Sequence, residues 1–284
     1  MKKKIVYILS TNFAGSHYLS LLLGSNSRAL HAGELFQLGR PAQKRKLQEV
    51  YLKETEVLDG IGIDNISQVY DIIFSRVDPQ VEVLVDTSKI VRGWADRFVD
   101  DDGYDRLYIH LIRDPRALVR RWLLGHGVKR QLHYRWKVMR SWGRLRPFAE
   151  WASTPRLWTY RWLLENRRIT DFIKEHHLNA SLVTYRDLAT QTEAEVRRLT
   201  EWMGLGYEPG QLEYWNREHI GSEKRGYEWV KKQKTRYFDL RWKTDLTVDL
   251  QERICGDGLV VDYLRELGLG FTEDGLTRLS KANS

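Results

Sequence analysis

Short apolar runs alternate with longer amphipathic segments along most of this chain. The runs are bounded by polar residues and have the length of buried strands in a parallel sheet. They cover residues 5–9, 81–85, 107–112 and 181–184. Helical periodicity predicts helices near residues 16–24, 41–56, 64–77, 88–99, 155–177 and 192–204. This alternation predicts an α/β fold, with a P-loop-like, doubly wound parallel sheet flanked by helices in a single domain over residues 1–284.

Polar residues follow each of the expected strands. Ligands of doubly wound sheets bind beyond the carboxyl ends of the strands, so these residues are candidates for the site. In the third of these segments, Pro115 suits the first turn of a helix and Asp114 can cap it, which puts Arg113 at the corner. An arginine at such a corner can bind an anionic ligand or pair with a nearby carboxylate. The four segments are residues 10–16, 86–89, 113–116 and 185–187.

The first segment has the character of an anion site. A helix that begins next to Gly15 and Ser16 turns free N–H groups and the positive end of its dipole toward the loop. The pattern GxxxxGK[ST] is absent, and no lysine follows the glycine to hold a terminal phosphate. The loop therefore predicts a phosphate-bearing donor other than a nucleoside triphosphate.

The positive charge is concentrated in one part of the sequence. The net charge is +8, and residues 113–146 contain eleven Lys or Arg against one acid. Six of the eleven tryptophans lie in or just after this segment, at positions 122, 136, 142, 151, 158 and 162. Such a segment can bind a polar anionic molecule or nucleic acid, or it can be core packing with a solvated face. We expect a helical Trp/Arg-rich lid over an acceptor site at residues 122–165.

Other features limit the class of protein. The single cysteine, Cys255, excludes an internal disulfide framework, and MKKKIVYIL leads into a strand without a signal-length apolar stretch. No window has the ~18 to 20 apolar residues of a membrane helix. We therefore expect a cytoplasmic protein without stable membrane insertion.

Several segments, in order along the chain, resemble the sulfotransferases that use 3′-phosphoadenosine-5′-phosphosulfate (PAPS). FAGSHYLSLLLGS is similar to the family's 5′-phosphosulfate loop, and LIRDPRAL to its 3′-phosphate corner. DTSK resembles an Asp-Ser-Ser-Lys stretch of bacterial and carbohydrate members. VTYRDLATQTEAEVRRLTEWMGLGYEP resembles the Tyr-Glu-Asp-Leu segment, and HIGSEKRGYEW with DLRW the basic loop that closes over the cofactor, here within residues 215–245.

The resemblance implies a set of cofactor contacts and no metal. The 5′-phosphosulfate would be held by the loop, the 3′-phosphate by basic residues, and the adenine would lie near Tyr185, which could equally be a core tyrosine. The loop residues are Ala14, Gly15, Ser16, His17 and Tyr18, and the basic residues are Arg113, Arg121, Lys224 and Arg225.

Three positions depart from the family pattern. Phe13 stands where the family has a Lys or Arg, His17 replaces a loop hydroxyl, and Arg121 replaces a serine. The charge missing at Phe13 must come from elsewhere, and Lys89 is the expected source. The alternative is a surface lysine paired with Asp86.

Sulfuryl transfer also needs a base for the acceptor proton. The resemblance places a catalytic glutamate at Glu34, with His17 and His31 as rivals. The predicted reaction transfers a sulfuryl group to a hydroxyl or amine of a polar acceptor, such as a glycan or small metabolite, without nucleic acid as partner. Two alternatives remain: a nucleotide-binding protein that has lost transfer, and a nucleic-acid-binding protein using the basic Trp/Arg segment. The sequence does not predict an oligomeric state.

Overall fold

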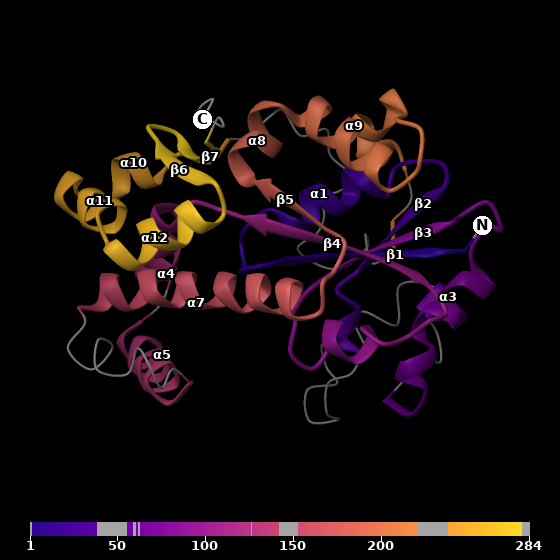
Figure 1. The fold of residues 1–284 in the computed structure, drawn as a ribbon, viewed down its shortest axis with the longest axis horizontal. Coiled ribbons are helices and arrows are strands. Elements are labelled where there is room, and N and C mark those ends of the chain that lie inside the picture. The colour runs from indigo at the N-terminus through magenta and orange to yellow at the C-terminus, as the bar shows by residue number, and fades with distance from the viewer. Residues whose placement is uncertain are drawn as a thin grey trace.

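A computed structural model of the protein describes residues 2–38, 56–58, 61, 63–125, 127–141, 153–217, 219–220 and 238–279. Its centre is a five-stranded parallel sheet with the strand order β2-β3-β1-β4-β5 (Figure 1). The strands are Lys4–Ser10 (β1), Ala29–Gly33 (β2), Val83–Lys89 (β3), Asp105–Ile112 (β4) and Ala180–Thr184 (β5). The predicted α/β fold with a helix-flanked parallel sheet is confirmed.

Alternate residues of β1 pack into two different cores. Ile5, Tyr7 and Leu9 face one side of the sheet, and Val6 and Ile8 face the other. The first side is covered by Val69–Arg76 (α3), Ala95–Phe98 (η5) and Thr154–Glu175 (α7). The second is covered by Ser16–Leu23 (α1), Tyr185–Thr190 (α8) and Thr192–Trp202 (α9) (Figure 1). Because both faces are buried, the strands read as nearly continuous apolar runs.

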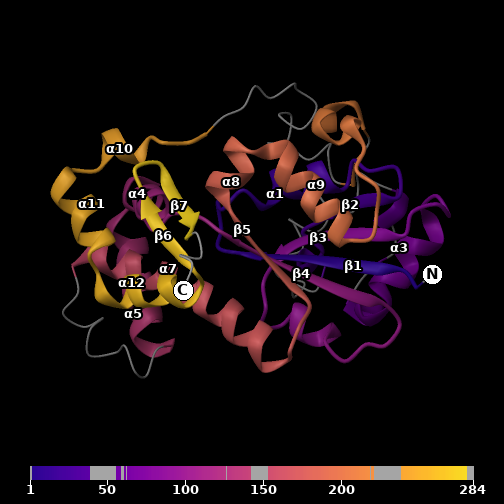
Figure 2. The ribbon, with the colours of Figure 1, turned by 45° about the horizontal axis from the view of Figure 1, so that its top comes forward.

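A third core lies beside the sheet. Pro115–Gly125 (α4) and the first half of α7 pack there against C-terminal elements that the sequence analysis did not predict (Figure 2). Those elements are Trp242–Asp245 (α10), Val248–Cys255 (α11), Gly258–Glu266 (α12) and an antiparallel hairpin of Leu269–Thr272 (β6) and Gly275–Arg278 (β7). Val128–Ser141 (α5) and the 3-10 segments Leu35–Gln37 (η1), Glu56–Leu58 (η3), Ile63–Gln68 (η4) and Pro209–Asn216 (η6) complete the described elements.

The expected lid is partly core. Trp122, Trp158 and Trp162 are buried in the third core, where they cannot stack on an acceptor, whereas Trp136 on α5 is exposed. Trp142 and Trp151 lie outside the described residues. The described helices include none that combines the length and apolarity needed to span a membrane.

Other elements differ from those expected from the sequence. A helix over residues 88–99 is wrong, because β3 runs through the DTSK stretch to Lys89 and only η5 is helical afterwards. β2 was not predicted as a strand. The helix expected at residues 41–56 lies almost entirely outside the described residues.

Candidate active site

The loop after β1 is shaped by two residues with positive φ. Phe13 has φ 69° and Gly15 has φ 100°, in the left-handed region that favours glycine. Gly15 immediately precedes α1, and a Cβ there would come within 3.0 Å of the Tyr185 ring. Only glycine fits this turn without displacing the ring. The next residues, Ser16 to Tyr18, form the first turn of α1, whose N–H groups point toward the loop.

Three of the predicted catalytic side chains meet beside this turn. Lys89 Nζ donates to Glu34 Oε1, and it lies 3.2 Å from His17 Nε2. His17 Nε2 in turn lies 2.9 Å from the same Glu34 oxygen. The exposed fractions of the side chains are 10% for Lys89, 14% for Glu34 and 18% for His17. A carboxylate, an ammonium group and an imidazole therefore lie in contact with one another and largely out of contact with water.

The electrostatics of the cluster keep Glu34 ionised. Burial acts to raise the pKa of its carboxyl, but the hydrogen bond with His17 and the charge of Lys89 outweigh this and hold the pKa well below its usual range. Gln37 Nε2 donates to the second carboxylate oxygen at 3.0 Å. Glu34 can therefore accept a proton, although its pairing with Lys89 makes it a weak base in this arrangement.

His31 lies behind this cluster. Its ring is 6.2 Å from that of His17, and its Nδ1 forms a hydrogen bond with Ser20 Oγ. Burial, reinforced by His219 and His17, lowers the pKa of His31 well below its ordinary value. Of the two rival bases, His17 is the one in contact with Glu34.

Lys89 does not pair with Asp86, so that alternative is wrong. Asp86 is fully buried and accepts hydrogen bonds from Tyr70 and Trp94, each at 2.8 Å, and from the Ser88 backbone at 2.7 Å. Lys89 itself has φ 65° and follows an irregularity in the pairing of β1 with β3. This backbone turn carries its side chain to Glu34 instead.

Arg113 lies on the other side of the loop and already has partners. Its Nη1 donates to the Phe13 carbonyl at 2.8 Å and its Nη2 to Asp239 Oδ2 at 2.9 Å. The guanidinium carbon lies 4.1 Å from the centre of the Tyr185 ring. Buried Nε has no acceptor among the described residues. Asp114 caps α4 as predicted, by accepting from the Arg116 backbone at 2.7 Å.

Phe13 and Arg121 form a pair at the mouth of the loop. The Phe13 ring is 48% exposed, and the Arg121 guanidinium lies over it at 4.7 Å from the ring centre. The arginine thus brings a cation close to the position where the family pattern has one.

The remaining predicted residues fall into two groups. Ala14 is fully buried and Tyr185 is half-buried beside Gly15, whereas Lys224 and Arg225 lie outside the described residues. Asp239 and Gln37 were not predicted as site residues. The spacing of Gln37 three residues after Glu34 in a helical turn could have indicated their contact.

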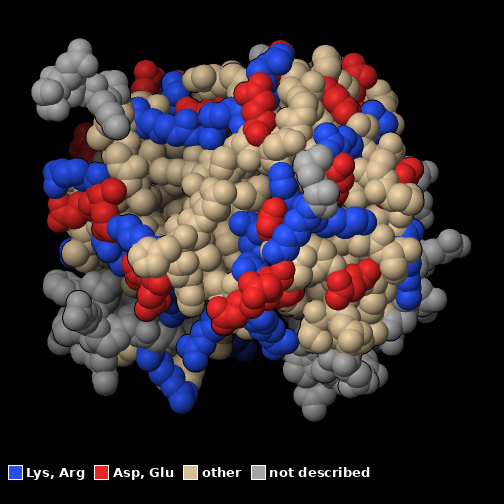
Figure 3. Space-filling view, turned by 45° about the vertical axis from the view of Figure 1, so that its right-hand side comes forward, with Lys and Arg blue, Asp and Glu red and all other residues tan. Residues whose placement is uncertain are grey.

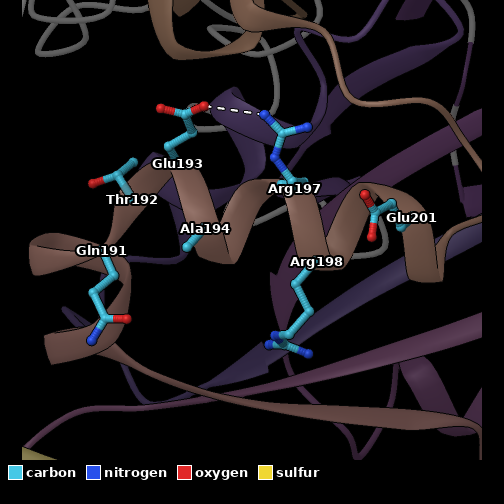
Figure 4. A pocket seen from close by; sticks show the side chains of 7 residues that line it. All are labelled: Gln191, Thr192, Glu193, Ala194, Arg197, Arg198 and Glu201. Atoms are coloured by element: carbon cyan, nitrogen blue, oxygen red, sulfur yellow. Dashed lines mark hydrogen bonds and ion pairs between the residues drawn. The ribbon is translucent and has the colours of Figure 1, made fainter.

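Other surfaces offer weaker sites. A hollow of about 510 Å3 on α9 is lined by Gln191, Glu193 and Arg198 among others, but a Glu193–Arg197 ion pair of 3.2 Å already pairs charges there (Figure 4). Figure 3 shows Lys and Arg mixed with Asp and Glu on the face in view, without one continuous basic surface. Among the described residues, no group of three or more His, Cys, Asp or Glu side chains could hold a metal ion.

Among the comparisons with known proteins, those with solved structures find the same fold. No protein-family model matches the sequence, and no curated protein matches it. Among solved structures, the sulfotransferase domain from the curacin biosynthetic pathway superposes with a TM-score of 0.54 and 18% identity, covering 89% of this chain and 96% of that domain. The sulfotransferase domain from the Synechococcus PCC 7002 olefin synthase gives 0.54 and 15%, covering 95% and 96%.

Proposed function

Because the chain has the fold of sulfotransferase domains, we propose that it is a sulfotransferase that uses PAPS. It would transfer a sulfuryl group to a hydroxyl or amine of a polar acceptor, such as a glycan or small metabolite. The observation that carries this proposal is the convergence of Glu34, His17 and Lys89 beside the turn at Gly15. A base, a hydrogen-bonding ring and a cation lie there next to a helix N-terminus.

The residues present fit such a cofactor at both of its charged ends. A Cβ at Gly15 would crowd the Tyr185 ring at 3.0 Å, and the first-turn N–H groups of α1 suit the 5′-phosphosulfate. Arg113 keeps a buried Nε with no acceptor among the described residues, which suits the 3′-phosphate. Tyr185 would line the adenine side.

Different residues of this chain would act on the sulfuryl donor and on the acceptor. PAPS supplies the sulfuryl group and a phosphate leaving group when bound. Lys89 and Arg121 would neutralise charge on the donor side, in place of the cation that Phe13 lacks. Glu34 would take the proton that the acceptor loses, with His17 orienting its carboxylate. Binding of both reactants would separate Lys89 from Glu34, which raises the basicity of the carboxylate.

A thermal-shift measurement tests this proposal. We expect 3′-phosphoadenosine-5′-phosphate (PAP) to raise the melting temperature, because a ligand that binds only the folded state stabilises it. ATP and NAD should do much less, since neither carries a 3′-phosphate for Arg113. Arg113→Ala should lose about 1.5 to 3 kcal/mol of PAP binding, the range for a hydrogen bond to a charged group. The matched control is Arg120→Ala, which removes an arginine that pairs instead with Asp245. Equal shifts from all three nucleotides would contradict the proposal.

A second candidate function is a nucleotide-binding protein that has lost transfer. It is favoured by Phe13 and by the pairing of Lys89 with Glu34, which together leave less free positive charge at the loop. Transfer of labelled sulfate from PAPS separates the two. A protein that shows the PAP shift without any transfer, across a broad set of polar acceptors, is the degenerate form.

A further inference from the structure

Glu34 and Lys89 are 55 residues apart and come from two separate elements. Glu34 immediately precedes η1, and Lys89 is the last residue of β3. A polar contact between main chain and side chain joins these elements, since the Phe36 backbone N–H donates to Ser88 Oγ at 3.1 Å. This bond continues the β2–β3 pairing, in which Gly33 lies opposite Asp86, and with it brings the carboxylate to the ammonium.

The Ser88 hydroxyl both accepts and donates a hydrogen bond. It accepts from Phe36 and donates to Asp86 Oδ1. Ser88 is only 2% exposed, so water cannot readily take over either bond if the hydroxyl is lost. The hydroxyl thus links η1 to a carboxylate inside the protein.

Asp86 provides a fixed anchor for that link. One oxygen accepts from the Ser88 N–H and hydroxyl, and the other accepts from Tyr70 on α3 and Trp94 before η5. Burial raises the pKa of Asp86, and the hydrogen bonds from Ser88, Trp94 and Tyr70 oppose this. A buried carboxylate is costly unless such donors satisfy it. The bonds from two separate elements hold its position.

The anchored turn also sets the backbone of the next residue. Lys89 follows directly at φ 65°, a conformation that is uncommon for a residue with a side chain and persists when the surroundings impose it. The same turn that receives the Phe36 N–H therefore aims the Lys89 side chain.

We propose that Ser88 and Asp86 are positioning residues that hold Glu34 against Lys89. Their importance for catalysis rests on the proposed function, whereas the positioning itself concerns the protein without ligand. Neither side chain needs to touch a substrate in this role.

The test is the titration of the Glu34 carboxyl, followed by carbon-13 NMR in the wild type and in Ser88→Ala. Wild-type Glu34 should stay ionised well below the ordinary glutamate value of about 4.3. In Ser88→Ala the midpoint should rise toward that value by about one pH unit or more, because the side-chain bond that fixes η1 against the end of β3 is lost. Thr87→Ala is the matched control: Thr87 is also buried, its hydroxyl has no partner among the described residues, and the titration should stay that of the wild type.

Two further variants protect the result against a folding defect. Ser88→Thr keeps a hydroxyl and should retain the wild-type titration. Tyr70→Phe removes a single donor to Asp86 and should raise the Glu34 midpoint by a smaller amount. An unchanged Glu34 titration in Ser88→Ala, or equal changes in Ser88→Ala and Thr87→Ala, would overturn the inference.

The PAP thermal shift separates this inference from the proposed function. If the Glu34 midpoint rises but the wild type shows no PAP shift, the positioning holds and the proposed function fails. If PAP binds and sulfate is transferred but the midpoint does not move, the proposed function stands and the positioning is wrong.

Discussion

The charged side chains of the candidate site largely neutralise one another. Lys89 and His17 both contact one carboxylate oxygen of Glu34, and all three side chains are mostly withdrawn from water. In such surroundings a pair is worth more than at the surface, and breaking it leaves an uncompensated charge. In the protein without ligand, the proposed base Glu34 and the proposed cation Lys89 are thus paired with each other.

The low pKa of Glu34 predicts a dependence of stability on pH. The folded pKa lies below the unfolded value of about 4.3, so the stabilisation from Glu34 is fully present above that value. It is lost as the pH falls from about 4.3 toward the folded pKa. The difference in unfolding free energy between wild type and Glu34→Gln should therefore shrink between pH 6 and pH 3, by on the order of 1 to 2 kcal/mol.

Urea unfolding at each pH measures this difference. Glu252→Gln, which changes an exposed carboxylate on α11, serves as the control and should show little dependence. A Glu34→Gln difference that is constant from pH 6 to pH 3 would mean that the carboxylate gains nothing from Lys89 and His17.

Lys89 and Phe13 make a paired prediction about turnover. If Lys89 replaces the cation missing at Phe13, Lys89→Ala should reduce sulfate transfer roughly 100-fold or more, as for loss of a preorganised electrostatic donor. Phe13→Lys should partly rescue that variant. Radiolabelled sulfate transfer measures both, with the PAP thermal shift as the check on cofactor binding. Wild-type transfer by Lys89→Ala would assign the charge to Arg121, His17 or the backbone instead.

Residues 238–240 cross over the corner between β4 and α4. Asp239 from this segment accepts from Arg113, and at 2.7 Å and 2.9 Å from two nitrogens of Arg241. Hydrogen bonds from Arg241 lower the pKa of Asp239 well below its usual range against the opposing effect of burial, and Arg113 contributes to the lowering. The Asp239 carboxylate thus accepts a hydrogen bond from the arginine that is expected to bind a phosphate.

This contact predicts a variant that binds cofactor more tightly. Asp239→Asn removes the negative charge that a 3′-phosphate would meet at Arg113, so the dissociation constant for PAP should fall several-fold. Calorimetric titration measures it. Asp245→Asn, at the pair with Arg120 on the outer side of α4, is the control and should leave the constant unchanged. Weaker PAP binding in Asp239→Asn would show that the carboxylate supports the site.

The elements divide into those with a local sequence signal and those without. The run at residues 5–9 is apolar and rich in β-branched residues, and the run at residues 107–112 is largely apolar, so their strands were predictable. β2 has the sequence ALHAG, without a β-branched residue, and becomes a strand through its pairing with β3. The strand propensity of a short segment does not indicate whether a distant strand will pair with it.

The candidate site shows the same division. His17 and Lys89 were predicted from segments that follow expected strands and Glu34 from the family resemblance, and the parallel sheet brings the three together. The contact of Asp239 with Arg113 spans 126 positions of sequence and depends on how the chain closes over the sheet, which spacing does not predict.

In the folded molecule, one part of the basic aromatic segment is buried and another part is exposed. Its tryptophans on α4 and α7 are covered by α10 to α12 and belong to a core, while α5 carries exposed Leu132 and Trp136. Single-strand nucleic-acid binding needs aromatic rings open to stacking along a cationic groove. Trp122, Trp158 and Trp162 are unavailable for that, which weakens this alternative function.

The central place of β1 has a consequence for how the chain is made. β1 is the first strand in sequence order, yet its neighbours are β3, which begins at Val83, and β4, which begins at Asp105. During synthesis, one edge of this apolar strand stays without its native partner until β3 has been made, and the other edge until β4 has been made. Such non-local pairing slows folding and exposes strand edges to association. The strand that leads into the candidate site is thus the one whose backbone edge waits longest for its native partner.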